Sequence, residues 1–249
     1  MNDFKFPKIL IAAPQHESKK YCWEAWKDRV NSLTYPNFDV YIAENSEDDG
    51  FANEIKETTD FKVERVGHNL ESVLDRTTKA HEACRLYAIN NKYDYMLHLE
   101  TDVIPPYDVI ERLLCGNKKV ISAVYDIFHG KSRKAMIQVS EKLDRSVGAY
   151  RVVPFIEHEE PLFFDGTIKQ VYHAGIGCIL IKKDIFEKIP FRYDRNNIFH
   201  ADTWFANDCF QKDIPIFADT SITCKHLNQT WLDAADEILK PILENKKHG

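Results

Sequence analysis

The sequence lacks long apolar runs, close cysteine pairs and an excess of positive charge, and each absence excludes a class of protein. No segment reaches the ~18 apolar residues of a membrane span, and no apolar run follows a basic patch at the N-terminus. The six cysteines are scattered without Cys-x-x-Cys spacing, which favours a reducing, cytoplasmic location. Acidic residues outnumber basic ones by 39 to 33, so the net charge of −6 does not favour non-specific binding to nucleic acid or membranes.

What is present indicates an α/β protein. The 249 residues suit one large domain, and 44% apolar residues permit a packed core. In the first half, short apolar runs alternate with helical periodicity, which predicts a mostly parallel sheet with helices on both faces. The expected strands cover residues 8–14, 38–46, 61–68, 93–106 and 118–127, and the expected helices cover residues 18–33, 71–91 and 107–114.

The second half is less regular. Residues 129–166 predict loops and small antiparallel strands, followed by a strand and helix over 168–189 and a helix over 202–212. The segment 214–227 contains two strand-like runs, and residues 231–249 predict a helical tail. We therefore expect one domain, with a first half at residues 1–127, a second half at residues 128–230 and a tail at residues 231–249.

Two carboxylates, Glu100 and Asp102, end the apolar stretch YDYMLHLETDVIPP. Residues i and i+2 of a strand point the same way, so these like charges would repel unless a cation sits beside them. Mg²⁺ and Mn²⁺ prefer oxygen ligands and often hold substrate phosphates through one or two carboxylates. The competing interpretation is an ordinary polar turn, because Asp-x-x-Pro is common in turns.

Other polar residues are expected at the same edge of the sheet. In open α/β sheets, ligands bind outside the carboxyl ends of the strands. The residues at those ends are Pro14, Glu44, Asn45, His68, Tyr125 and Asp126, together with the two carboxylates.

The stretch LETDVIPP resembles the metal-binding Asp-x-Asp motif of GT-A glycosyltransferases, especially the family 2-like group, and the order of elements is similar from about Lys8 to Leu227. The resemblance implies a Rossmann-like GT-A fold with a small antiparallel acceptor-side portion. The segment HADTWFANDCFQKDIPIFADTSITCKHL, residues 200–227, resembles the family's segment that ends in a histidine. By this resemblance Asp102 and His226 would bind Mn²⁺ or Mg²⁺, and Asp202 would be the catalytic base.

The resemblance also implies which residues bind the nucleotide sugar. Pro14 ends the strand that borders the base, Glu44 and Asn45 follow the second strand, and Arg76 matches an arginine near the diphosphate. Glu100 replaces the first aspartate of the motif, so it is expected to reach a ribose hydroxyl or a metal-bound water. His16, after the first strand, either reaches the nucleotide or belongs to a loop.

On the acceptor side, HAGIGCILIKKDIFEKI resembles the family's Gly-x-Gly segment. Gly175 and Gly177 would either permit close approach of the acceptor or relieve crowding in a strand. Trp204 lies beside Asp202 and is the candidate for stacking on a sugar, whereas Trp23 and Trp26 are expected in the core.

Together these motifs imply a metal-dependent glycosyltransferase that moves a sugar from a nucleotide-diphosphate-sugar donor, most commonly a UDP-sugar, to an acceptor hydroxyl. The acceptor is left open among saccharides, glycoconjugates and modified nucleic acids. Inversion with Asp202 as base is expected, although a retaining reaction would use the same metal site. The alternatives are a non-catalytic nucleotide-sugar-binding domain and a nucleotidyltransferase. The latter usually has a glycine-rich loop after the first strand, where this chain reads PQHESKK.

Overall fold

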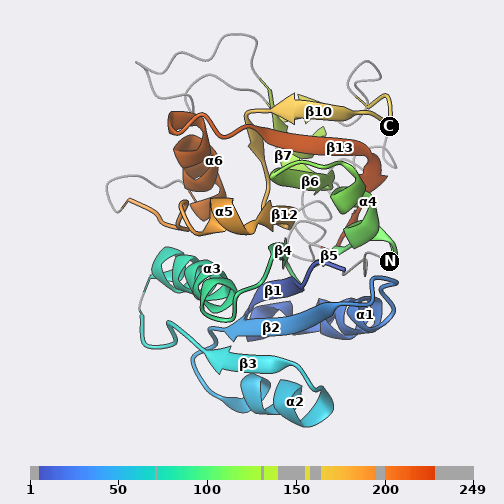
Figure 1. Cartoon of the computed structure of the whole chain (residues 1–249). Coiled ribbons are helices and arrows are strands. Elements are labelled where there is room, and N and C mark those ends of the chain that lie inside the picture. Colours follow the sequence, from blue (N-terminus) through green and yellow to red (C-terminus); the bar gives the residue numbers. More distant parts are fainter. Residues whose placement is uncertain are drawn as a thin grey trace, which may run out of the picture.

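A single large sheet organises the protein. The computed structural model describes residues 6–70, 72–129, 132–139, 155–157, 164–194 and 200–227. The strand order is β10-β13-β6-β12-β4-β1-β2-β3, and all of these strands run in one direction except β10 and β12 (Figure 1). The strands are β1 (Ile9–Gln15), β2 (Phe38–Glu44), β3 (Lys62–Arg65), β4 (Tyr95–Leu99), β6 (Val120–Val124), β10 (Ile168–Val171), β12 (Cys178–Lys182) and β13 (Ile216–Thr223).

Helices cover both faces of this sheet, which confirms the predicted α/β class. In Figure 1, α3 (Val73–Asn90), α5 (Lys183–Phe186) and α6 (Ala201–Gln211) lie to the left of the sheet. The short 3₁₀ helix η1 (Glu17–Lys19) leads into α1 (Lys20–Asn31), which packs with α2 (Gly50–Thr58) and α4 (Val109–Cys115) on the other face. Strand β1 is buried on both sides, because Leu10 packs in the cluster with α3 and Ile9 in the cluster with α1.

Smaller antiparallel sheets complete the fold. One contains β7 (Asp126–His129), β8 (Ser132–Gln138), β9 (Phe155–Glu157) and β11 (His173–Ala174). The other pairs β5 (Val103–Ile104) with β14 (Lys225–His226), and its register sets His226 opposite Val103. This second pairing joins the end of the chain's described part to the turn that contains Asp102.

Several expectations about the elements are corrected. The expected strand over 93–106 ends at Leu99, so Glu100 and Asp102 lie in a turn closed by a 3.0 Å hydrogen bond from the Val103 N–H to the Glu100 carbonyl. The prediction that Glu100 and Asp102 point the same way as residues i and i+2 of a strand was therefore wrong. The expected strand over 118–127 divides into β6 and β7, which belong to different sheets.

Helix α2 was not predicted, although Phe51, Ala52 and Ile55 give it a buried stripe. The indole pair Trp23 and Trp26 is buried with stacked rings at 5.5 Å, as expected for core residues. The predicted tail over 231–249 lies outside the described residues, and the division of the domain at residues 127 and 230 stays a prediction. Within the described ranges, no helix has the length and apolar character needed to cross a membrane.

Candidate functional site

Two adjoining pockets lie at the carboxyl ends of β1 and β4. The first, here the Asn45 pocket, is a hollow of about 330 Å³ lined by Pro14, Asn45 and Arg76 among others. The second, here the Asp202 pocket, has about 370 Å³ and includes Asp102, Asp202 and His226 in its lining. Both pockets are lined by Lys19, Thr77, His81 and Glu100, so these four residues mark the junction between them.

A larger hollow of about 970 Å³ lies at the opposite, amino-terminal edge of the sheet and is lined by Lys8, Asp94 and Lys182 among others. It lies away from the carboxyl ends of the parallel strands, where ligands bind in open α/β sheets. We therefore place the candidate site at the two smaller pockets.

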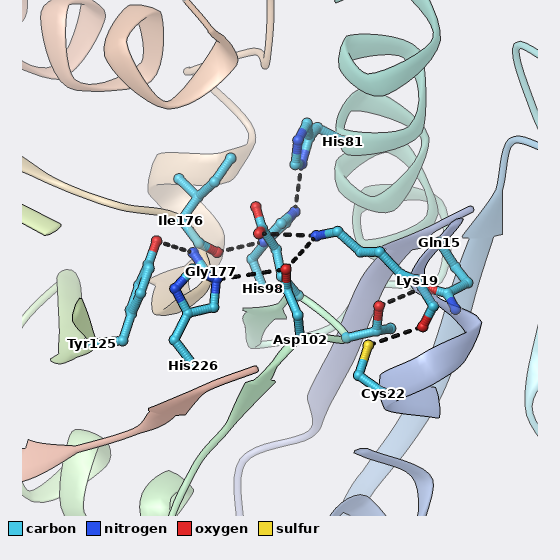
Figure 2. Close-up of polar contacts among 12 residues, drawn as sticks. Gln15, Lys19, Cys22, His81, His98, Asp102, Tyr125, Ile176, Gly177 and His226 are labelled. Atoms are coloured by element: carbon cyan, nitrogen blue, oxygen red, sulfur yellow. Dashed lines mark hydrogen bonds and ion pairs between the residues drawn. The ribbon is translucent and has the colours of Figure 1, made fainter. Parts of the chain in front are cut away.

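Lys19 supplies a cation to the two carboxylates of the turn. Its Nζ lies 3.0 Å from Asp102 Oδ2 (Figure 2) and 3.5 Å from Glu100 Oε2. Burial opposes the charge on Lys19, but the carboxylates of Glu100 and Asp102 outweigh it and raise the lysine's pKa. The repulsion expected between the two acids is thus relieved by a side chain of the protein.

His226 approaches the same carboxylate from β14. Its Nε2 lies 3.5 Å from Asp102 Oδ2, and its Nδ1 lies 2.7 Å from the carbonyl oxygen of Asp126. A carbonyl only accepts hydrogen bonds, so Nδ1 donates and Nε2 is the atom directed at Asp102. Burial raises the pKa of Asp102, but the hydrogen bond from His226 and the charge of Lys19 outweigh burial and bring it to about 2.

This pair can contribute to a metal site. A histidine whose Nδ1 donates to a backbone carbonyl presents Nε2 in the way that metal-binding histidines do. Asp102 Oδ1 is buried and has no hydrogen-bond partner among the described residues. However, no group of three or more His, Cys, Asp or Glu side chains in the described part of the chain could hold a metal. The residues therefore fit a cation that takes its remaining ligands from substrate oxygens or water, and Mn²⁺ or Mg²⁺ binding stays a prediction.

A chain of two buried histidines reaches the junction of the pockets. His98 Nδ1 lies 2.6 Å from the Ile176 carbonyl oxygen, and His81 Nδ1 lies 2.8 Å from His98 Nε2 (Figure 2). Burial lowers the pKa of His98 to about 4 and that of His81 well below its usual value, so both rings are neutral at pH 7. Because His98 Nδ1 must donate to the carbonyl, His98 Nε2 accepts from His81 Nδ1. His81 Nε2 is then an acceptor.

Asp202 lies in the first turn of α6, whose N-cap residue is His200. Its Oδ1 accepts a 2.7 Å hydrogen bond from the Thr203 N–H, and its Oδ2 lies 3.5 Å from Nε2 of the buried His173. Burial raises the pKa of Asp202, but the adjacent ring of His173 and the Thr203 N–H outweigh burial and bring it to about 2. Asp202 therefore faces the same pocket as Asp102 and His226 as an ionised carboxylate.

The residues predicted to bind the nucleotide divide into two groups. Pro14, Asn45 and Arg76 line the Asn45 pocket, and Asn45 Oδ1 is buried without a hydrogen-bond partner in the described part of the chain. Glu44 is fully buried, and its Oε1 accepts a 2.9 Å hydrogen bond from the Ser46 N–H. Glu44 thus shapes the turn that carries Asn45, and a contact between Glu44 and a ligand stays a prediction.

The side chain of Arg76 is engaged within the protein. It donates a 3.2 Å hydrogen bond to the Leu70 carbonyl and lies 3.6 Å from Glu47 Oε1. His16, the N-cap of η1, also lines the Asn45 pocket and accepts a 3.1 Å hydrogen bond from the Ser18 N–H at its Nδ1.

The two glycines of the Gly-x-Gly segment accommodate Tyr125. A Cβ atom at Gly175 would lie 2.0 Å from Tyr125 Oη, and one at Gly177 would lie 2.7 Å from Tyr125 Cζ. The Gly177 N–H also donates a 3.0 Å hydrogen bond to Tyr125 Oη. Relief of crowding therefore accounts for both glycines, whereas a contact with an acceptor stays a prediction.

Trp204 has a neighbour over its ring, because the guanidinium carbon of Arg192 lies 4.4 Å from the ring centre. Trp204 is not among the residues that line either pocket in the described part of the structure. Its predicted role in stacking on a sugar stays a prediction.

Sequence reasoning missed Lys19, His81 and His98. For Lys19 the signal was available, since two neighbouring acids called for a cation and the segment after β1 contains Lys19 and Lys20. For the two histidines no local pattern indicates the pairing, because it depends on how α3 packs on β4.

Comparisons with known proteins show the fold and nothing finer. No protein-family model matches the chain, and no curated protein sequence does. The solved structure of A197 from STIV is similar at 15% identity and a TM-score of 0.50, over 89% of this chain and 86% of A197. Two structures of S. aureus TarS 1-349 are also similar. The one in complex with UDP has 12% identity and a TM-score of 0.53, and the other has 10% and 0.54. Each match covers 88% of this chain, which spans 60% of the TarS chain. The fold is therefore GT-A-like, as the sequence predicted.

Proposed function

We propose that the chain is a glycosyltransferase whose donor is a nucleotide-diphosphate sugar, and we favour a UDP-sugar. The observation that carries this proposal is that Asp102 and His226, in the lining of the Asp202 pocket, lie beside Lys19 at the junction of the two pockets. The GT-A-like fold supports it, and one similar structure, S. aureus TarS 1-349, was solved in complex with UDP.

The two pockets suggest how such a donor would lie. The nucleoside would occupy the Asn45 pocket, where Asn45 Oδ1 is buried without a partner among the described residues and would accept a hydrogen bond from the base or ribose. The sugar would occupy the Asp202 pocket, and the diphosphate would lie at the junction. His81 Nε2 accepts hydrogen bonds, so it would face a hydroxyl group rather than a phosphate oxygen.

Asp102 and His226 would hold the divalent cation. A bound Mn²⁺ or Mg²⁺ would stabilise the negative charge that develops on the leaving diphosphate. His226 is held for this role by Asp126, and Arg76 would add positive charge on the nucleotide side.

Asp202 would act on the acceptor. Its pKa of about 2 keeps the carboxylate ionised at neutral pH, so it would accept a hydrogen bond from the acceptor hydroxyl and then its proton. The acceptor oxygen would form a bond to C1 of the sugar while the bond from C1 to the phosphate oxygen breaks. Attack on the face opposite the leaving group would invert C1.

The test combines binding and turnover. Thermal shifts with UDP, GDP, ADP and their common sugar conjugates, with and without Mn²⁺, would identify the donor. Hydrolysis of that donor should then require Mn²⁺ and should fall at least about 100-fold in Asp102→Asn, the loss typical when a group that stabilises the transition state is removed. Asp202→Asn should keep donor binding and lose transfer to an acceptor.

Asp208→Asn is the matched control, because Asp208 lies on the same helix but pairs with Arg192 at 2.6 Å. It should change neither donor binding nor turnover. Absence of binding by every nucleotide-diphosphate sugar would overturn the proposed function, and full activity of Asp102→Asn would overturn the role of that carboxylate.

A further inference from the structure

The ammonium group of Lys19 occupies the position where the turn's two carboxylates need a positive charge. It lies 3.0 Å from Asp102 Oδ2, the same oxygen that His226 Nε2 approaches at 3.5 Å. Lys19 Nζ and His226 Nε2 thus both approach the same oxygen of Asp102. A divalent cation at Asp102 would be repelled by the ammonium group at this distance.

The backbone at Lys19 is anchored, but its side chain is not enclosed. The Lys19 N–H donates a 2.9 Å hydrogen bond to the His16 carbonyl, and the Glu17 N–H donates at 2.8 Å to Ser46 Oγ, which ties η1 to the end of β2. The lysine side chain is 32% exposed and lines both pockets. Its flexible four-carbon stem allows the ammonium group to turn from the carboxylates toward a ligand at the junction.

We propose that Lys19 is a diphosphate-binding residue whose ammonium group leaves Asp102 for the donor's diphosphate and so frees that carboxylate for the metal. This inference rests on the proposed function, since it assigns a residue to the donor's phosphates. A diphosphate entering the junction brings negative charge within reach of Lys19. The ammonium group then leaves the carboxylate oxygens and binds the phosphate oxygens. Lys19 no longer competes with a metal cation for Asp102 Oδ2.

The exchange has two measurable consequences. Without nucleotide, Lys19 should weaken the binding of a divalent cation, because both compete for Asp102. Without metal, Lys19 should strengthen the binding of UDP, because it is the cation nearest to the diphosphate. In the native protein, UDP and Mn²⁺ should therefore raise each other's affinity by the same factor.

Lys19→Met tests both consequences, because methionine keeps much of the apolar stem and removes the charge. Mn²⁺ binding would be followed by electron paramagnetic resonance, and UDP binding in EDTA by calorimetry. We expect Lys19→Met to bind Mn²⁺ alone about tenfold more tightly than the native protein and UDP alone about tenfold more weakly, as is typical for coupling between charged ligands.

Lys20→Met is the matched control. Lys20 is the next residue, but its side chain is 57% exposed, pairs with Glu54 and lines neither pocket. It should leave both affinities unchanged. If Lys19→Met and Lys20→Met bind Mn²⁺ alone equally, or bind UDP equally, the role of Lys19 is overturned while the proposed function stands. Native protein that binds no nucleotide diphosphate overturns both.

A measurement on the native protein avoids any dependence on how the variant folds. In ¹⁵N-lysine-labelled protein, the ammonium resonance of Lys19, held between two carboxylates, should be observable at low temperature. Addition of UDP should shift this resonance, and later addition of Mn²⁺ should broaden it because the ion is paramagnetic. A Lys19 resonance that UDP leaves in place would contradict the exchange.

Discussion

Gly175→Ala tests how tightly the Gly-x-Gly segment packs on Tyr125. The new Cβ would lie 2.0 Å from Tyr125 Oη, 2.8 Å from Tyr125 Cζ and 2.4 Å from Met136 Cγ, whereas ordinary contacts are 3.4 Å or longer. The tyrosine is only 6% exposed, so its ring is packed by other side chains over most of its surface. Overpacking of this kind costs ~1–3 kcal/mol.

The movement of Tyr125 also breaks a hydrogen bond. Its Oη accepts from the Gly177 N–H at 3.0 Å, and leaving a buried donor unpaired costs a further ~1–3 kcal/mol. We therefore expect Gly175→Ala to lower the free energy of unfolding by about 4 kcal/mol. For a chain of this size, that corresponds to a decrease in Tm of roughly 10 °C.

Urea unfolding followed by circular dichroism measures this loss, with Gly166→Ala as control. Gly166 has φ of +79° and no atom within 4 Å of an added Cβ, so its substitution should cost only the ~1 kcal/mol of backbone strain. Adding Tyr125→Phe to Gly175→Ala removes the closest contact, so the double variant should be at least about 1 kcal/mol more stable than the sum of the single changes predicts. A Gly175→Ala protein within about 0.5 kcal/mol of the native protein would refute the packing argument.

The same substitution should affect the site. The Tyr125 ring packs edge-on against the His226 ring, with centroids 5.4 Å apart. A displaced Tyr125 ring would move His226 from its position beside Asp102. Mn²⁺ binding measured in the presence of UDP should therefore weaken in Gly175→Ala and remain unchanged in Gly166→Ala.

Three further predictions concern ionisable side chains. Because the folded pKa of Asp202 is about 2, below its usual 3.8, ionised Asp202 stabilises the fold above about pH 4 and loses this effect as the pH falls toward 2. The difference in unfolding free energy between native protein and Asp202→Asn should thus shrink by about 2 kcal/mol over that range, and a constant difference would refute it. Long-range ¹H–¹⁵N spectra at pH 7 should show His81 and His98 as neutral rings protonated at Nδ1, and an Nε2-protonated His98 would contradict the chain. Cys115 is the exposed cysteine, so Ellman's reagent should label it first, and a fast phase that persists in Cys115→Ser would be contrary to the structure.

The fold class and the proximity of Asp102 and His226 could be predicted from the sequence. Short apolar runs that alternate with helical segments predicted the sheet. Such a run suits a strand that is buried on both faces, as β1 is, because successive residues of β1 pack in opposite core clusters. The resemblance of the segment that ends near His226 predicted that His226 lies beside Asp102, although the two are far apart in the sequence. Their side chains do lie 3.5 Å apart. That proximity is a geometric fact, while the metal between them stays a prediction.

What could not be predicted depends on side-chain packing between elements. The two acids converge through a turn rather than along a strand, because β4 ends at Leu99. Val73, the first residue of α3, is 65% exposed, whereas His81 of the same helix is buried against His98. Helical periodicity identifies an apolar face, but it does not show that a histidine on that face meets another histidine.

The charges at the junction suggest why a divalent cation would bind together with the donor rather than before it. In the free protein, the ammonium group of Lys19 already lies beside the carboxylates of Glu100 and Asp102, and the ring of His226 lies against the same oxygen of Asp102. A divalent ion added there would be repelled by Lys19 and would create a local excess of positive charge. A diphosphate brings about two negative charges, which reverses the excess and makes the added cation favourable. Mn²⁺ that binds the native protein equally well with and without UDP would contradict this argument.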